Sequence, residues 1–136
     1  MSIEQTQRLF LLAMGLGLVP VALTYGVIPK QSLPFLYGIS DPDLPTRHLF
    51  RAVMGLYLGM ICFWLAGALR RDLRIAALWT VFVFVTGIAS GRLLSIGLDG
   101  WPQPLLVFYP FAEFALAAIS FALIVLARDR KGTGAT

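Results

Sequence analysis

Residues 9–29 read LFLLAMGLGLVPVALTYGVIP and carry no charged side chain. A helix rises about 1.5 Å per residue, so a helix of this length crosses a hydrocarbon core about 30 Å thick. A cleaved secretory signal is the alternative interpretation. The apolar run is too long for one, Glu4 interrupts a basic N-terminal region, and no A-x-A-like site follows. The stretch therefore predicts an uncleaved membrane-spanning helix over residues 8–29.

The whole composition points the same way. Of the 136 residues, 58% are hydrophobic and only 13% are charged, with a mean hydropathy of +0.80. These values lie outside the usual range of soluble domains. A chain of this length holds about four spans of about 20 residues each with short connectors. We therefore expect an all-α, four-transmembrane-helix bundle that forms a single domain over residues 1–127.

Three further apolar segments complete this bundle. Apolar segments and their breaks predict spans over residues 46–69, 73–98 and 104–127. The pair Arg70-Arg71 with Asp72 ends the second span and forms a tight turn. The stretch from Asp99 to Pro104 breaks the chain between the third and fourth spans. Residues 128–136 are expected to form a polar cytoplasmic tail.

The connector after the first span is rich in proline. It contains Pro29, Pro34, Pro42 and Pro45 together with Gly38. Because proline lacks an N–H and fixes φ, this spacing argues against a continuous helix. The connector is therefore predicted to be a loop that lies along the membrane interface.

Basic residues near the span ends predict the orientation. One side of the membrane holds Arg8, Arg70, Arg71, Arg74, Arg128, Arg130 and Lys131, and the other holds Lys30, Arg47 and Arg51. Cytoplasmic ends of membrane helices carry the excess of Lys and Arg. Both termini are therefore expected to be cytoplasmic, in a bacterial inner (plasma) membrane.

Several function classes find no support in the sequence. The net charge of +4 is spread over span ends and forms no basic patch, so nucleic acid is not an expected partner. Cys62 and His48 are the only cysteine and histidine and lie about 21 Å apart along one helix, too far to share a metal. No P-loop, HExxH, GxSxG or dinucleotide fingerprint is present. No catalytic residue, metal site or cofactor is predicted.

Charged residues inside the predicted spans are the candidate site. Taking each span to begin or end at its predicted boundary, Arg51, Arg92 and Glu113 lie roughly 8, 9 and 14 Å below the outer surface. A charge that faces lipid is costly, so we expect these groups to turn inward and pair. Helical spacing places further polar or small residues on the same faces. Three stripes result: Arg92, Ser95 and Asp99; His48, Arg51, Gly55 and Gly59; and Tyr109, Glu113, Ala117 and Ser120.

Glycines at Gly55/Gly59 and Gly87/Gly91 fit close packing of these stripes against other helices. Two interpretations of the polar cluster follow. In the first, Glu113 is neutralised by Arg92, Arg51 or both, and the cluster only holds the helices in register. In the second, the excess of arginine leaves a pocket rich in donors, suited to an anionic or carbonyl-bearing ligand. Asp99 bears on the choice, because it either caps the helix or reaches Arg92 and balances the charge.

The run GRLLSIGLDGWPQP, with FRAVMGLYLG around Arg51 and the later Glu113, resembles a bacterial family of four-helix inner-membrane proteins. This family is the domain of unknown function 4345. The most specific part of the resemblance comprises Arg92, Ser95, Asp99, Gly100 and Pro102. The chain is more distantly similar to DoxX-type membrane proteins, some of which are associated with quinone-linked or redox complexes. The resemblance implies a four-helix membrane fold and assigns no activity.

The sequence therefore leaves two alternative functions. The preferred one is a non-enzymatic accessory or assembly subunit whose partners are the lipid bilayer and a larger membrane complex or a second copy of the chain. The alternative is binding or transport of a lipid, quinone or other small amphiphile at the polar cluster. In that case the site residues are Arg51, Arg92, Ser95, Asp99, Tyr109 and Glu113.

Overall fold

The structure, a computed structural model, describes residues 2–102 and 104–132. The helices are α1 (Ile3–Gly26), α2 (Pro29–Tyr37), α3 (Leu44–Leu69), α4 (Arg74–Asp99) and α5 (Pro104–Gly132). The segments long and apolar enough to cross a membrane are Ile3–Gly26, Leu44–Leu69, Arg74–Asp99 and Leu106–Arg128. The prediction of an all-α chain with four candidate membrane spans is confirmed.

The helix ends differ from the predicted span ends because polar residues extend the helices. α1 begins at Ile3 because Ser2 and Gln5 form a capping box: the Gln5 N–H donates to Ser2 Oγ, and the Ser2 N–H donates to Gln5 Oε1. α5 continues to Gly132, where a polar tail was expected. Gln103, in the predicted break, and residues 133–136 of that tail lie outside the described residues.

The connector predicted as a loop contains the helix α2, so that expectation was wrong. Pro29 occupies the first helical turn, where its missing N–H has no helical partner to lose. Gly38 ends the helix at a φ of 68°, a left-handed conformation that favours glycine, and its N–H donates to the carbonyls of Leu33 and Pro34. Proline spacing argued correctly against a long helix but not against a helix of this length.

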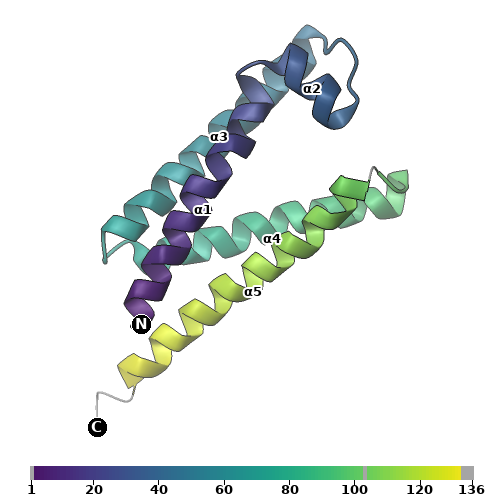
Figure 1. Ribbon diagram of the computed structural model, residues 1–136. Helices are drawn as coiled ribbons and strands as arrows, with labels where there is room; N and C mark the ends of the chain where they lie inside the picture. Colours follow the sequence, from purple (N-terminus) through teal and green to yellow (C-terminus); the bar gives the residue numbers. More distant parts are fainter. Residues whose placement is uncertain (1, 103, 133–136) are drawn as a thin grey trace.

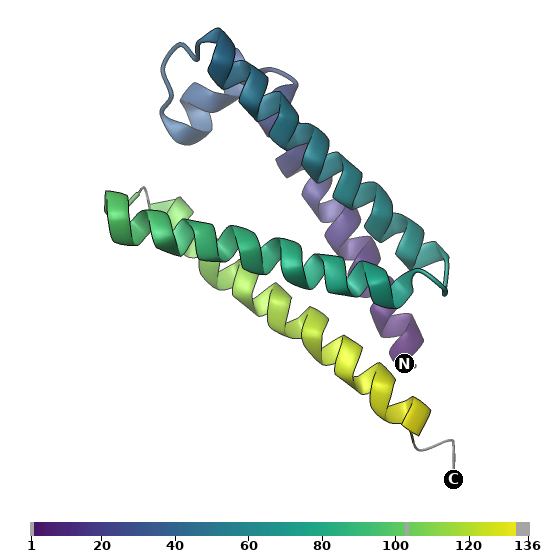
Figure 2. The ribbon, with the colours of Figure 1, turned by 180° about the vertical axis from the view of Figure 1, so that it is seen from behind.

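The four long helices form two pairs. α1 packs along α3 and α4 packs along α5. The two pairs lie close together near the end that holds the N-terminus and diverge toward α2 and the connection between α4 and α5 (Figures 1 and 2). We refer to the half in which the pairs lie close together as the packed half and to the other as the diverging half.

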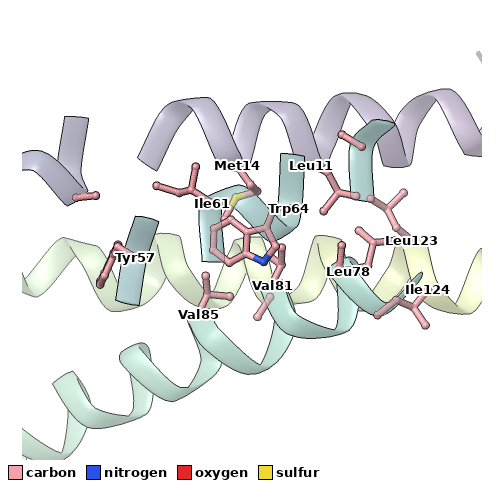
Figure 3. Packing of buried hydrophobic residues seen from close by; sticks show 14 of the residues in the cluster. Leu11, Met14, Tyr57, Ile61, Trp64, Leu78, Val81, Val85, Leu123 and Ile124 are labelled. Atoms are coloured by element: carbon pink, nitrogen blue, oxygen red, sulfur yellow. The ribbon is translucent and has the colours of Figure 1, made fainter. Parts of the chain in front are cut away.

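The packed half is built around Trp64, whose side chain is fully buried. It belongs to a core cluster with side chains from all four long helices, shown in Figure 3, among them Leu11, Met14, Ile61, Leu78, Val81, Leu123 and Ile124. The Trp64 Nε1–H donates to Thr80 Oγ1 at 3.1 Å, so the indole is satisfied within the core. Lipid is as apolar as these side chains, so close packing and hydrogen bonds are what hold the helices together.

The glycines that allow close helix approach are not those predicted. A Cβ added at Gly15 would lie 2.7 Å from Leu65 Cδ2, and one at Gly67 would clash with the Ala77 side chain. A Cβ at Gly55, Gly59, Gly87 or Gly91 would meet nothing within 4 Å among the described residues. The predicted packing role of those four glycines is therefore wrong, because they face away from the neighbouring helices.

Candidate functional site

A cleft lies between the two helix pairs in their diverging half. Its volume is about 330 Å³, within the usual size of ligand pockets. The walls are mostly apolar and include Leu18, Val85, Ile88 and Leu116. Residues of α2 also contribute, because Leu36 and Tyr37 reach the same space. All five helices therefore supply part of the cleft.

The polar end of the cleft is an ion pair between α4 and α5. Arg92 Nε donates to Glu113 Oε1 at 3.1 Å, and the two side chains are 24% and 17% exposed. Both residues also line the cleft. Charged partners of this kind are the expected solution for ionisable groups inside a membrane span. The pair joins two helices and leaves part of each group facing the cleft.

Tyr109 completes this end of the cleft. The Arg92 guanidinium carbon lies 5.2 Å from the centre of the Tyr109 ring, within the range of a cation–π contact. Tyr109 is one helical turn before Glu113 on α5, so both can reach Arg92 from the same helix face. Arg92 is thus held from two sides, by a carboxylate and by an aromatic ring.

The second carboxylate oxygen of Glu113 is not satisfied. Glu113 Oε2 is buried and has no hydrogen-bond partner among the described residues. An ionised carboxylate only accepts hydrogen bonds, and each of its oxygens has room for more than one. Leaving such an acceptor buried without a partner costs about 1–3 kcal/mol or more. The ion pair therefore leaves unused acceptor capacity on the Glu113 carboxylate, whose side chain lines the cleft and is 17% exposed.

Three further tyrosines line the cleft, from α1, α2 and α3. Tyr25 stacks on Tyr37 with ring centroids 6.0 Å apart and contacts Tyr57 at 5.2 Å. Burial raises the pKa of Tyr37 well above its ordinary value, so this phenol stays protonated. The Tyr37 hydroxyl therefore adds no charge to the lining of the cleft.

Arg51 does not join this site. Arg51 is exposed, and its Nε donates to the carbonyl of Gly26 at the end of α1, at a distance of 3.2 Å. It forms no ion pair with any carboxylate in the described part of the chain. The helix stripe that was predicted to point inward, with His48, Gly55 and Gly59, is exposed as well. The inward face of α3 is instead the one that carries Tyr57, Ile61 and Trp64.

Ser95 and Asp99 bond to each other and lie apart from the ion pair. The Ser95 hydroxyl donates to Asp99 Oδ2 at 2.9 Å, and both residues are exposed. Neither residue lines the cleft. Of the residues predicted for the site, the structure brings together Arg92, Tyr109 and Glu113 and places Arg51, Ser95 and Asp99 elsewhere.

A pocket at the polar cluster was one of the two interpretations of the sequence, but Tyr25, Tyr37 and Tyr57 were not predicted to line it. Tyr25 and Tyr57 stand in apolar runs that would equally suit lipid-facing positions. Their signal was a polar hydroxyl in the middle of an otherwise apolar helix face, which usually needs a partner or a cavity. No group of three or more metal-ligating side chains occurs in the ranges that the structure describes.

Comparison with known proteins gives one match. The family described as "Domain of unknown function (DUF4345)" matches residues 6–124, which confirms the resemblance drawn from the sequence. No curated protein and no solved structure is significantly similar to the chain.

Proposed function

The chain belongs to the DUF4345 family, and we propose that it is a multi-pass membrane protein that binds a small amphiphile in the cleft between its two helix pairs. In this proposal the apolar tail of the amphiphile lies against Leu18, Val85 and Leu116, and its polar head meets Arg92, Tyr109 and Glu113. No chemical step is assigned to the site.

The observation that carries the proposal is the pairing of an apolar cleft with one polar end. The volume is about 330 Å³, and the two charged side chains of its lining are Arg92 and Glu113. A mostly apolar pocket with a few converging polar groups is the usual form of a small-molecule site. An amphiphile has the same division between an apolar and a polar part.

The cleft favours ligand binding over a purely structural role for the ion pair. Side chains that face open space lack van der Waals contacts that a bound molecule can supply. Here α4 and α5 are joined by the pair while the space beside it stays open. A ligand in the cleft would restore those contacts.

We further propose that both termini lie in the cytoplasm of a bacterial inner membrane, so that the cleft opens in the outer half of the bilayer. The support is the excess of Lys and Arg at the end that holds Arg8, Arg70, Arg71 and Arg74. Cysteine-reactive labels on intact cells test this. A cysteine introduced at Gln5 should be protected and one at Asp41 labelled, in a background with Cys62 replaced by Ala; the reverse pattern would contradict the orientation.

An accessory or assembly role is the second proposal. Gly55 and Gly59 on α3 and Gly87 and Gly91 on α4 expose open helix surface, and small residues allow membrane helices to approach closely. Purification in mild detergent, followed by mass spectrometry of proteins and lipids together, separates the two functions. A stoichiometric protein partner and no retained amphiphile would favour the accessory role.

A filled cleft tests amphiphile binding directly. Ala112 lines the cleft, whereas Ala115 on the same helix is exposed. Ala112→Phe should abolish binding of a fluorescent alkyl probe to the protein in nanodiscs, and Ala115→Phe should leave it unchanged. Both variants are first checked for an unaltered thermal midpoint. Equal probe binding by the two variants would contradict the proposal.

A further inference from the structure

The charge balance of the cleft limits what its ligand can be. Of the side chains that line it, Arg92 is the cation and Glu113 the anion, and they are already paired at 3.1 Å. The excess of arginine that suggested an anionic ligand depended on Arg51, which instead donates to the Gly26 carbonyl. With Arg51 outside the site, the charges of the described lining residues cancel. An anionic head would therefore have to compete with Glu113 for Arg92.

Although the two charges of the ion pair cancel, the hydrogen-bond acceptors of Glu113 are not all used. Glu113 Oε1 accepts from Arg92, while Glu113 Oε2 is buried with no partner among the described residues. Carboxylate oxygens only accept hydrogen bonds. The Glu113 side chain lines the cleft and is 17% exposed, so a ligand head that pairs with this carboxylate must supply an O–H or N–H.

From these two facts we infer that the cleft selects an uncharged amphiphile whose head donates a hydrogen bond to the Glu113 carboxylate. This inference rests on the proposed function and specifies its ligand class. Long-chain alcohols, phenols and primary amides meet the requirement, whereas ethers and simple esters lack the donor and fatty acids carry the wrong charge at neutral pH.

Three probes with one tail separate these possibilities. Dodecanol is neutral with a donor, dodecyl methyl ether is neutral without one, and dodecanoate is an anion. Binding is measured by displacement of the fluorescent alkyl probe from the protein in nanodiscs, with each concentration corrected for partition into the lipid. We expect dodecanol to bind about tenfold or more tightly than the ether, because a buried acceptor left unpaired penalises the ether. Dodecanoate should bind more weakly than dodecanol.

A double variant tests whether the preference for dodecanol depends on Glu113. Arg92→Leu/Glu113→Leu removes both charges together, and replacing a buried ion pair by apolar residues of similar size is often tolerated. In this variant dodecanol should lose its advantage over the ether while the ether still binds. Ser95→Ala/Asp99→Ala removes the other polar pair of α4, which lies outside the cleft, and should keep the advantage.

The binding results distinguish a wrong ligand class from a wrong proposed function. Equal binding of dodecanol and the ether by the natural protein would overturn the inference and leave amphiphile binding standing. Tightest binding of dodecanoate would also overturn it, in favour of an anionic ligand. Failure of all three probes to displace the fluorescent probe would contradict the proposed function itself.

Discussion

Arg92 Nε donates to Glu113 Oε1 at 3.1 Å and thereby ties α4 to α5 beside an open cleft. The bond satisfies one carboxylate oxygen and leaves Oε2 buried without a partner in the described chain. This contact joins two helices and leaves unused acceptor capacity on a carboxylate that lines the cleft, the group that we propose to bind the ligand.

Removing one member of the ion pair should destabilise the protein more than removing both. Arg92→Leu leaves Glu113 as an unpaired charge at an apolar site, and we expect a loss of about 2 kcal/mol or more in the free energy of unfolding. Arg92→Leu/Glu113→Leu should recover most of that loss. Unfolding in mixed detergent micelles measures both. A double variant no more stable than Arg92→Leu would show that the pair does not act as a unit.

Gly67 should be far more sensitive to a methyl group than the exposed glycines. A Cβ at Gly67 would clash with Ala77 where α3 meets α4, so Gly67→Ala should cost about 1–3 kcal/mol. Gly55→Ala adds the same methyl group where nothing lies within 4 Å, and its higher helix propensity should leave the stability unchanged or slightly raised. Thermal midpoints of the two variants give the comparison. A similar loss in both would contradict the packing described.

Arg74 should behave differently from its neighbour Arg71. Arg74 is buried, and its guanidinium donates to the carbonyls of Gly67 and Ala68 at 3.3 and 3.1 Å, which satisfies the end of α3. Arg74→Met should therefore cost about 1.5–3 kcal/mol. Arg71, whose pairing with Glu4 is exposed, should lose less than about 1 kcal/mol as Arg71→Met. Equal losses would mean that Arg74 acts only as a surface charge.

The start of α3 should weaken in acid. The Thr46 hydroxyl and its N–H lower the pKa of Asp43 below its ordinary value. A lowered pKa contributes stability above the unfolded-state pKa of about 4, and that stability is lost as the pH falls through the folded-state pKa. Hydrogen-exchange protection of the Thr46 amide should therefore fall at acid pH. Asp43→Asn keeps a cap that does not titrate, so its protection should stay constant over the same range; a parallel fall would assign the effect to another group.

Much of the architecture could be predicted because hydropathy and span length are read directly from the chain. The pairing of Glu113 with Arg92 was one of the predicted alternatives, since charged groups inside apolar helices are expected to pair, but the sequence did not exclude Arg51 as the partner. The α5 stripe predicted to face inward does so: Ala117 and Ser120 are buried, and Ser120 donates to the Leu78 carbonyl at 2.8 Å.

The direction that α3 faces could not be predicted from its polar residues. Arg51 and Gly55 suggested one face, but Tyr57 and Trp64 on another face fill the core. Small residues permit close approach without requiring it, whereas a large side chain must find a partner of matching shape. The buried hydrogen bond from Gln7 Nε2 to the Leu123 carbonyl could not be predicted either, because every residue has a backbone carbonyl and the sequence does not show which one a side chain will contact.

The most direct test of the account is photo-crosslinking from the bilayer with dodecanol that carries a diazirine in its tail. If the cleft binds an amphiphile, labelling of Leu18, Val85 and Leu116 should saturate and be removed by excess unlabelled dodecanol. Labelling of outward residues such as Leu94 and Phe111 should rise in proportion to the probe and resist competition. Labelling without a saturable component at the cleft residues would contradict the central claim.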